Sequence, residues 1–478
     1  MAALEFVPRP RPSPHTAPIR PRPPAESPAP RARLAVISTY DELCGIAAYT
    51  RALERQLSRD FDVTVFNLSQ YLLRSTHPRT RQFADRHIGE ICAALRGYDA
   101  VNVQLEFGIL GRSPRDIYRR LLWIIEAAPR LSVTFHTVLR AERFDLPSFA
   151  RNALRLNFAE AAALFSRHRR DRLLSAGIAE RLRRAGRRKP VTVIVHTRRD
   201  ALQMEYVHGL RPVFDHPLAF LSEAEARAVR KAASRARFSL LDAVPATAKL
   251  IGVFGFLGRY KSFETAVKAL HHLPPDYHLL IFGGVHPNEI VPRQAIDPVV
   301  LGLFEAGYID ATVPERIAAQ GRVAGPFLSV AVDGATRELL FGHPKDLSRR
   351  IHFLGATSDD DFLCGMAICD VAVFPYREVG QSASGPIAQA LELGCRVIAS
   401  RTHTFLQFGR YHPNRIEYFD VGNHLELASR IRARPQFAAG PHPLAFTAET
   451  NRAVYRAANL GGGAEAPPPS RHSPCPSG

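Results

Sequence analysis

One stretch of the sequence combines small, hydroxyl-bearing residues with the start of a helix, a combination that binds anions. It is GQSASGPIAQALELG, residues 380–394, which lies between two apolar runs. Pro386 suits the first turn of a helix. The N–H groups of a helix start have no partner within the helix, so they bind phosphate well. We therefore expect a strand, an anion-binding loop containing Ser382, Ser384 and Gly385, and then a short helix.

A second stretch, FGFLGRYKSFETAVKAL at 254–270, places two cations beside a helix start. An apolar strand ends in a Gly-containing turn with Arg259 and Lys261, and Ser262 is expected to cap the helix that follows. If both stretches follow parallel strands, both sites lie at the carboxyl edge of one sheet. A diphosphate held between them would account for both. The alternative is that the two cations are ordinary turn residues.

The first half of the chain alternates short apolar runs with longer helical patterns, which is typical of a parallel, doubly wound α/β sheet. The sequence then turns polar and helical over residues 197–245. The strands expected before that point are 34–38, 63–66, 100–105, 132–135, 162–166 and 191–195.

The strand pattern restarts in the second half, so two α/β domains in tandem are the simplest account. We place the first domain at 32–240 and the second at 241–440. The helix expected over 441–459 should pack back on the first domain. The later strands are expected at 249–256, 277–283, 350–355, 371–375 and 396–400, with added helices in VVLGLFEAGYI and VPERIAAQG between the second and third.

The two ends of the chain have a composition that does not support a core. Residues 1–31 are dominated by Pro and Arg, and residues 460–478 by Gly, Pro and Ser, so both are predicted to be disordered tails. No stretch of about 20 residues is apolar enough to span a bilayer, and neither end has the apolar core of a signal peptide. We expect a cytoplasmic protein.

The net charge of +18 does not by itself indicate nucleic-acid binding. The 63 basic residues are six Lys and 57 Arg, a bias that fits an arginine-favouring codon supply, and they are dispersed. RLRRAGRRK at 181–189 is the only dense run, and it is either a solvated helix end or a contact with an anionic membrane. We expect no nucleic-acid partner; a polyanion-binding protein remains an alternative that rests on charge alone.

The sequence gives no pattern for a metal or a redox cofactor. The spacing of Cys364 and Cys369 fits neither a redox site nor a zinc site, so we interpret the cysteines as buried thiols. The acidic run 359–361 is better explained as a helix start than as a metal site. The first strand is not followed by a G-x-G-x-x-G fingerprint, which leaves nicotinamide binding as a minor alternative. We expect no metal and no cofactor.

These motifs, in this order, resemble the family-4 retaining glycosyltransferases, also called group 1 glycosyltransferases. That family has the GT-B fold, in which two Rossmann-like domains face each other across a cleft. The resemblance spans residues 33–458. It rests on IGVFGFLGRYKSFETAVKAL, LLIFGGVHP, IHFLGATSDDDF, CDVAVFPYREVGQSASGPIAQALELGCRVIAS, CGIAAYTRAL, VNVQLEFGILG and VTFHT.

The resemblance implies transfer of a sugar from a nucleotide diphosphate sugar to an acceptor hydroxyl, with retention, in polysaccharide or glycolipid assembly. Lys261 and Arg259 would stabilise the leaving diphosphate against the loop backbone, and the nucleotide sugar would be a co-substrate. His136 would face the transferred sugar from the first domain, where Gly45 would let its loop approach the ligands. A glycan or lipid-linked acceptor is implied, and a peripheral contact with the inner face of the membrane fits that setting. Glu106 is a weaker candidate that could equally orient a loop.

The sequence departs from the family at three positions. Two glutamates that often flank this loop are replaced by Gln381 and Gln389, which still hydrogen-bond hydroxyls but without a carboxylate charge. Phe256 stands where the family often has an arginine, and Arg259 is its candidate substitute. A non-catalytic nucleotide-sugar-binding or scaffold protein of the same fold is therefore the alternative.

Overall fold

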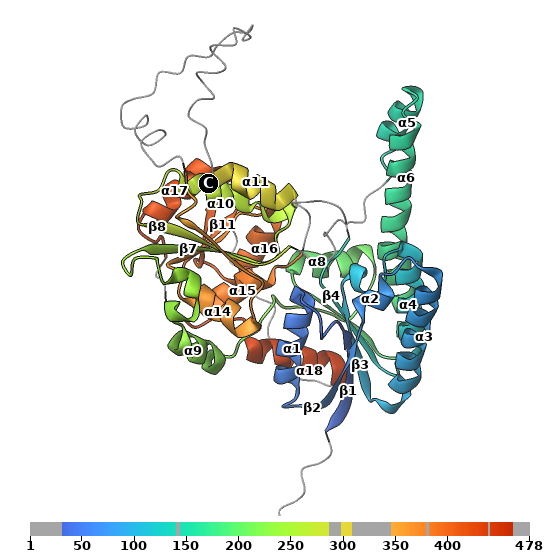
Figure 1. Cartoon of the computed structure of the whole chain (residues 1–478). Coiled ribbons are helices and arrows are strands. Elements are labelled where there is room, and N and C mark those ends of the chain that lie inside the picture. Colours follow the sequence, from blue (N-terminus) through green and yellow to red (C-terminus); the bar gives the residue numbers. More distant parts are fainter. Residues whose placement is uncertain are drawn as a thin grey trace, which may run out of the picture. The chain divides into compact units, whose positions relative to one another are not determined.

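Two sheets of six parallel strands, each flanked by helices, form the described part of the chain (Figure 1). The computed structural model describes residues 31–139, 144–285, 298–307, 346–378, 382–437 and 440–461. From Ala32 onward the chain forms one compact unit. The tails predicted to be disordered lie outside the described residues, except for Arg31, Leu460 and Gly461, as do the VPERIAAQG segment and Gln381.

The first sheet has the strand order β2-β1-β3-β4-β5-β6, with every neighbouring pair parallel. Three of its inner strands, β3, β4 and β5, are buried along their length, as apolar strands covered by helices on both faces should be. Reversal of the order between β1 and β3 creates a switch point, where such sheets bind ligands. The strands are β1 Ala32–Ser38, β2 Phe61–Asn67, β3 Ala100–Leu105, β4 Leu131–Phe135, β5 Val191–Val195 and β6 Val213–Asp215.

Five of the strands expected in this half are confirmed, and the sixth is wrong. Residues 162–166 lie inside a helix, α6, because the alanines and Glu160 that precede them are helix formers. The short edge strand β6 was not anticipated. The helices of this half are α1 Gly45–Leu57, α2 Gln70–Leu73, α3 Pro78–Ala94, α4 Pro114–Ala127, α5 Leu146–Leu154, α6 Phe158–Arg172, α7 Ile178–Gly186, α8 Arg198–Leu202 and α9 Glu223–Ala232.

The second sheet has the order β12-β11-β10-β7-β8-β9, again entirely parallel. Read from β9, this is the 3-2-1-4-5-6 order of a dinucleotide-binding sheet, with its switch point between β7 and β10. All five strands expected here are confirmed, and the short β12 is additional. The strands are β7 Lys249–Phe254, β8 Tyr277–Phe282, β9 Ile351–Gly355, β10 Val371–Phe374, β11 Val397–Ser400 and β12 Ile416–Phe419.

The helices expected after the serine–glycine loop, after the Arg259–Lys261 turn and at the acidic run begin where the sequence predicts, with one difference in how a helix is capped. Gly394, just after α15, has a φ of +73° that suits glycine. Ser358 caps α14 and confirms the acidic run as a helix start. Ser262 does not cap α10: its backbone is left-handed, and its hydroxyl contacts Thr265 instead. The helices are α10 Phe263–Leu270, α11 Pro298–Gly307, α14 Asp359–Ala367, α15 Gly385–Glu392, α16 His403–Tyr411 and α17 His424–Arg432.

The last helix, α18 Ala448–Leu460, packs against α1 and the first sheet (Figure 1). Tyr455 is fully buried there, and its hydroxyl lies 3.0 Å from the Thr134 hydroxyl on β4. Asn459 accepts a hydrogen bond of 2.8 Å from Ser132 on the same strand. The end of the chain is therefore part of the first sheet's core.

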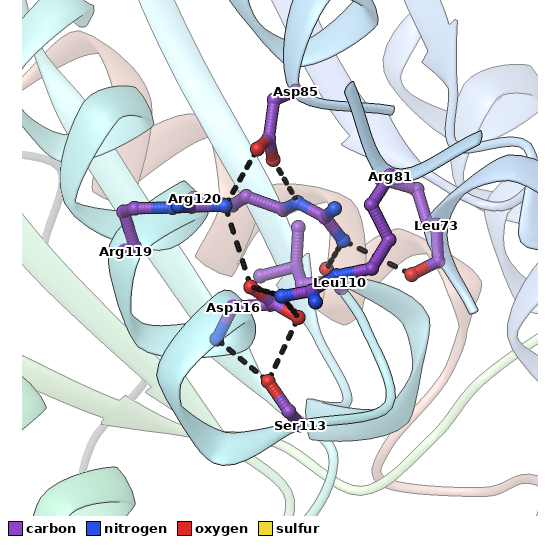
Figure 2. Close-up of polar contacts among 8 residues, drawn as sticks. All are labelled: Leu73, Arg81, Asp85, Leu110, Ser113, Asp116, Arg119 and Arg120. Atoms are coloured by element: carbon purple, nitrogen blue, oxygen red, sulfur yellow. Dashed lines mark hydrogen bonds and ion pairs between the residues drawn. The ribbon is translucent and has the colours of Figure 1, made fainter. Parts of the chain in front are cut away.

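A network of arginines and aspartates fixes the loop that follows β3 (Figure 2). Arg120 on α4 is fully buried, and its Nε donates to Asp85 at 2.9 Å. Its Nη1 donates to the carbonyl oxygens of Leu73 and Leu110 at 3.0 and 2.8 Å. Around it, Asp116 accepts hydrogen bonds from Arg81, Arg119 and Ser113. Two loops at the carboxyl edge of the first sheet are thereby tied to α3 and α4.

None of the described helices combines the length and the apolar content needed to cross a bilayer. The described cysteines are free thiols: Cys364 and Cys369 are buried, as expected, and Cys44, Cys92 and Cys395 are half-buried.

Candidate functional site

Lys261 lies at the switch point of the second sheet, in the short 3-10 turn Arg259–Lys261 that follows β7. Only 5% of its surface is exposed. Its amine donates to the hydroxyl of Tyr376 and lies 3.9 Å from the centroid of that ring. Burial lowers the pKa of Lys261 to about 7. An anion beside this amine would therefore favour its charged form.

Tyr376 joins this lysine to the serine–glycine loop. It follows β10, and its hydroxyl lies 3.2 Å from the Ser384 hydroxyl, directly before α15. Residues from the two loops of one switch point thus meet through a single phenol. Our sequence analysis missed Tyr376, although its place just after an apolar strand was a signal for a ligand-facing position.

The turn itself separates the two cations. Arg259 is exposed, whereas Lys261 is buried. Gly255 has a φ of +109°, and a side chain there would start 3.0 Å from the Lys261 amine, so glycine leaves room for it. Arg377 holds the turn by donating its backbone N–H to the Tyr260 carbonyl at 2.7 Å.

Gly385 has a packing role that its sequence context did not suggest. We expected Gly385 as part of the anion-binding loop, and the structure adds that a side chain at this position would start 3.0 Å from the ring of Phe220. The Phe220 segment is held from the same helix, because Glu392 accepts from its N–H at 2.7 Å. Burial raises the pKa of Glu392 to about 8. A bulky side chain at position 385 would therefore disturb the packing on Phe220, whatever its effect on a bound phosphate.

The remaining loop and donor candidates are distributed as follows. Ser382 is buried, and its hydroxyl accepts from the Val138 N–H at 3.1 Å, so the loop after β10 touches the loop after β4. Gln389 is half-buried on α15. Gly45 begins α1, and a side chain there would meet no atom within 4 Å among those described, which leaves space beside the helix start.

His136 lies directly after β4 and is 6% exposed. Its Nε2 is 2.8 Å from the Gln104 side-chain oxygen, and its Nδ1 is 3.2 Å from Nε2 of His196. Burial holds the pKa of His136 well below its usual range, so the ring is neutral. Both ring nitrogens already have protein partners, and a sugar hydroxyl would have to replace one of them.

His196 was missed, although the sequence carried a signal for it. It follows β5 in VIVHT, which repeats the pattern of VTFHT around His136, and β4 and β5 are neighbours in register. Its Nδ1 lies 3.1 Å from the His216 carbonyl oxygen, and burial lowers its pKa to about 4. Glu106, after β3, accepts from the Thr137 hydroxyl at 2.8 Å and so links two loops of the first sheet.

The basic run 181–189 is largely engaged in contacts within the protein. Glu180 pairs with Arg183 and Arg184, and Arg188 pairs with Glu126 at 2.9 Å. The amine of Lys189 donates to main-chain carbonyl oxygens. Within the described ranges, no three His, Cys, Asp or Glu side chains gather as a metal site would require.

Comparison with known proteins gives a fold and no sequence relative. No protein-family model matches the sequence, and no curated protein matches it. Among solved structures, a UDP-forming α,α-trehalose-phosphate synthase from Burkholderia xenovorans matches with a TM-score of 0.51 and 12% identity, over 89% of this chain and 95% of that one.

Two further structures are similar at lower scores. HepE from Anabaena, in complex with UDP and glucose, has a TM-score of 0.46 and 14% identity over 89% of this chain and 95% of its own. Sucrose-phosphate synthase from Thermosynechococcus elongatus has a TM-score of 0.45 and 16% identity, over 84% of this chain and 89% of its own. Together with the two parallel sheets, the comparison confirms the predicted class: the chain has the GT-B fold of two Rossmann-like domains.

Proposed function

We propose that the protein is a retaining glycosyltransferase of family 4, which moves a sugar from a nucleotide diphosphate sugar to an acceptor hydroxyl. The observation that carries the proposal is the meeting of Lys261, Tyr376 and Ser384 at the switch point of the second sheet. The helix start provides a fixed positive potential at the place where doubly wound sheets bind nucleotides, and the buried amine adds a positive charge when an anion binds beside it.

In the proposed reaction the donor's diphosphate lies between Lys261 and the first turn of α15. The bond between the anomeric carbon and the diphosphate oxygen breaks, and the acceptor oxygen bonds to that carbon on the same face. The acceptor proton passes to the departing phosphate oxygen. Charge grows on the leaving group as the bond breaks, so preorganised donors and the ammonium of Lys261 stabilise the transition state more than the ground state. Arg259 supplies a second positive charge from the exposed side of the turn.

His136 takes part in this proposal as a neutral ring. Its contact with Gln104 is the one that a sugar hydroxyl would replace, while its contact with His196 keeps the ring in place. Gln381 and Gln389 would bind sugar or ribose hydroxyls through their amides. Because the trehalose-phosphate synthase is described as UDP-forming, uridine diphosphate sugars come first among the donors to test.

We further propose a glycan or lipid-linked acceptor, in polysaccharide or glycolipid assembly, reached at an anionic membrane surface. The segment 145–172, which contains α5 and α6, supports the membrane contact (Figure 1). It exposes Leu154, Leu156 and Phe158 at 85%, 74% and 64%, and has six arginines against three acidic residues. Exposed apolar side chains beside arginines are the composition that binds anionic bilayers.

A panel of nucleotide sugars tests the enzymatic proposal against the non-catalytic alternative. Binding would be measured by calorimetry, and turnover by release of nucleoside diphosphate in the presence of candidate acceptors. We expect binding and release with the same donor, and turnover that survives excess chelator. Binding without release under any acceptor would favour the scaffold protein. Loss of turnover with chelator, and its rescue by magnesium or manganese, would contradict the role given to Lys261 and Arg259.

A further inference from the structure

A polar pocket opens where the loops after β5 and β10 approach each other. The first sheet contributes the start of α8, and the second sheet contributes Ser382 and the start of α16. Its lining includes the side chains of Arg199, Asp200, Gln203, Glu378, Ser382 and His403.

Asp200 is the unusual member of this pocket. It is 8% exposed, and within the described part of the chain its Oδ2 has no hydrogen-bond partner. Burial raises the pKa of Asp200, against the opposing effect of the hydroxyls of Thr197 and Ser382. Buried acceptors without partners are rare, because each forfeits the hydrogen bonds it would make in water. An unpaired, buried carboxylate oxygen at the wall of a polar pocket is therefore a candidate partner for a ligand's O–H group.

The other lining groups narrow the class of ligand. Glu378 accepts from the His403 N–H at 2.5 Å, so a second carboxylate lies at this pocket. Gln203 donates to the Leu139 carbonyl oxygen at 2.7 Å, which orients its amide. Two carboxylates disfavour a phosphate or another anion here, and Arg199 disfavours a cation. Carboxylates, amides and a guanidinium together suit a neutral molecule with several hydroxyl groups.

We infer that Asp200 accepts a hydrogen bond from a hydroxyl of the donor's transferred sugar and so contributes to donor specificity. The inference rests on the proposed function. Ser382 lines this pocket and lies two residues before Ser384 of the proposed diphosphate site, and the sugar is bonded directly to the diphosphate. We therefore place the sugar of a donor bound at Lys261 toward the Asp200 pocket.

Calorimetry with UDP and with UDP-sugars separates this inference from the proposed function. We expect Asp200→Asn to bind UDP as wild type does, and to lose about tenfold in affinity for the UDP-sugar, the scale of one hydrogen bond to a charged group. Asp242→Asn, the same change at an exposed site, should alter neither affinity. Thermal unfolding would establish that both variants are folded.

Donor analogues that each lack one sugar hydroxyl provide a second test of the contact with Asp200. In wild type, removing the hydroxyl that Asp200 binds should weaken the donor, and in Asp200→Asn the same removal should have no further effect. Equal losses for UDP and for the UDP-sugar in Asp200→Asn, or no loss for either, would overturn the role of Asp200 and leave the proposed function intact. Failure of wild type to bind any nucleotide or nucleotide sugar would overturn both.

Discussion

Lys261 owes its low pKa to burial, and burial makes its charge responsive to a ligand. With a pKa of about 7 in the unliganded protein, the amine is largely neutral above that pH. A diphosphate would raise the pKa, because opposite charge favours the ammonium form. Binding should therefore take up a proton above pH 7.

The first prediction concerns the pH dependence of UDP binding. UDP affinity should be highest below pH 7 and fall as the pH rises through 7, by up to about tenfold per pH unit while the bound amine stays charged. Calorimetry in buffers of different ionisation enthalpy would show proton uptake between pH 7 and 9. Lys261→Met should abolish the uptake, and Lys268→Met, at an exposed lysine on α10, should retain it. Uptake that is unchanged in Lys261→Met would place the diphosphate elsewhere.

For single residues, the sequence singled out the two stretches that we propose bind the diphosphate, and it missed Tyr376, which joins them. Lys261 and Ser384 could be proposed because glycines, serines and a cation beside helix starts have a direct electrostatic meaning. Tyr376 carried only the weaker signal of its place after an apolar strand, because its role depends on a contact across two loops. The packing of Gly385 on Phe220 was hidden for the same reason: the partners are distant in sequence.

The hydrogen-bond network around Arg120 positions two loops of the first domain, through the carbonyl oxygens of Leu73 and Leu110. The Arg120 guanidinium is fully buried, and Asp85 is the acid that pairs with it. Removing one partner of a buried pair leaves a charge without compensation, which costs far more than an exposed pair contributes.

A second prediction belongs to this network. Asp85→Asn should lower the free energy of unfolding by about 3 kcal/mol, because it removes the carboxylate that pairs directly with the buried Arg120 guanidinium. Urea unfolding would measure this. Glu126→Gln, which breaks the exposed pair with Arg188, is the control and should change stability by less than about 1 kcal/mol. Equal stability of the two variants would show that the network is not what holds these loops.

Secondary structure followed from the sequence wherever strands were apolar and central. β3, β4, β8 and β10 were predictable because strands buried on both faces read as continuous apolar runs. β6 and β12 were missed because three- and four-residue edge strands give too little pattern. Residues 162–166 were misassigned because a short apolar run fits a helix as well as a strand.

For the whole molecule, the order and spacing of several motifs together were enough to predict the fold, although no single motif was enough to predict a site. Two alternating α/β patterns indicate two doubly wound domains, which the sheets confirm. The contacts of the histidine network could not be predicted from the sequence, since His136, His196 and His216 come from three loops that only the folded sheet brings together.

A third prediction concerns the segment 145–172. The protein should sediment with vesicles of anionic phospholipid and much less with neutral ones, because its exposed arginines and apolar side chains act together. Replacing Leu154 and Leu156 by Asp should reduce binding several-fold while thermal unfolding stays near wild type, since both side chains are exposed. Vesicle binding that does not depend on these residues would assign the contact to another surface.

The most direct test of the proposed function is to measure sugar transfer by the Lys261→Ala variant. Loss of this amine should cost about 3 kcal/mol of transition-state stabilisation, or roughly a hundredfold in turnover, as removal of one preorganised electrostatic contact does. The variant should remain folded, and Lys268→Ala should transfer sugar as wild type does. Nucleoside diphosphate release, measured with the best donor of the panel, gives the result. Wild-type turnover in folded Lys261→Ala would contradict the proposal that Lys261 and the serine–glycine loop hold the same diphosphate.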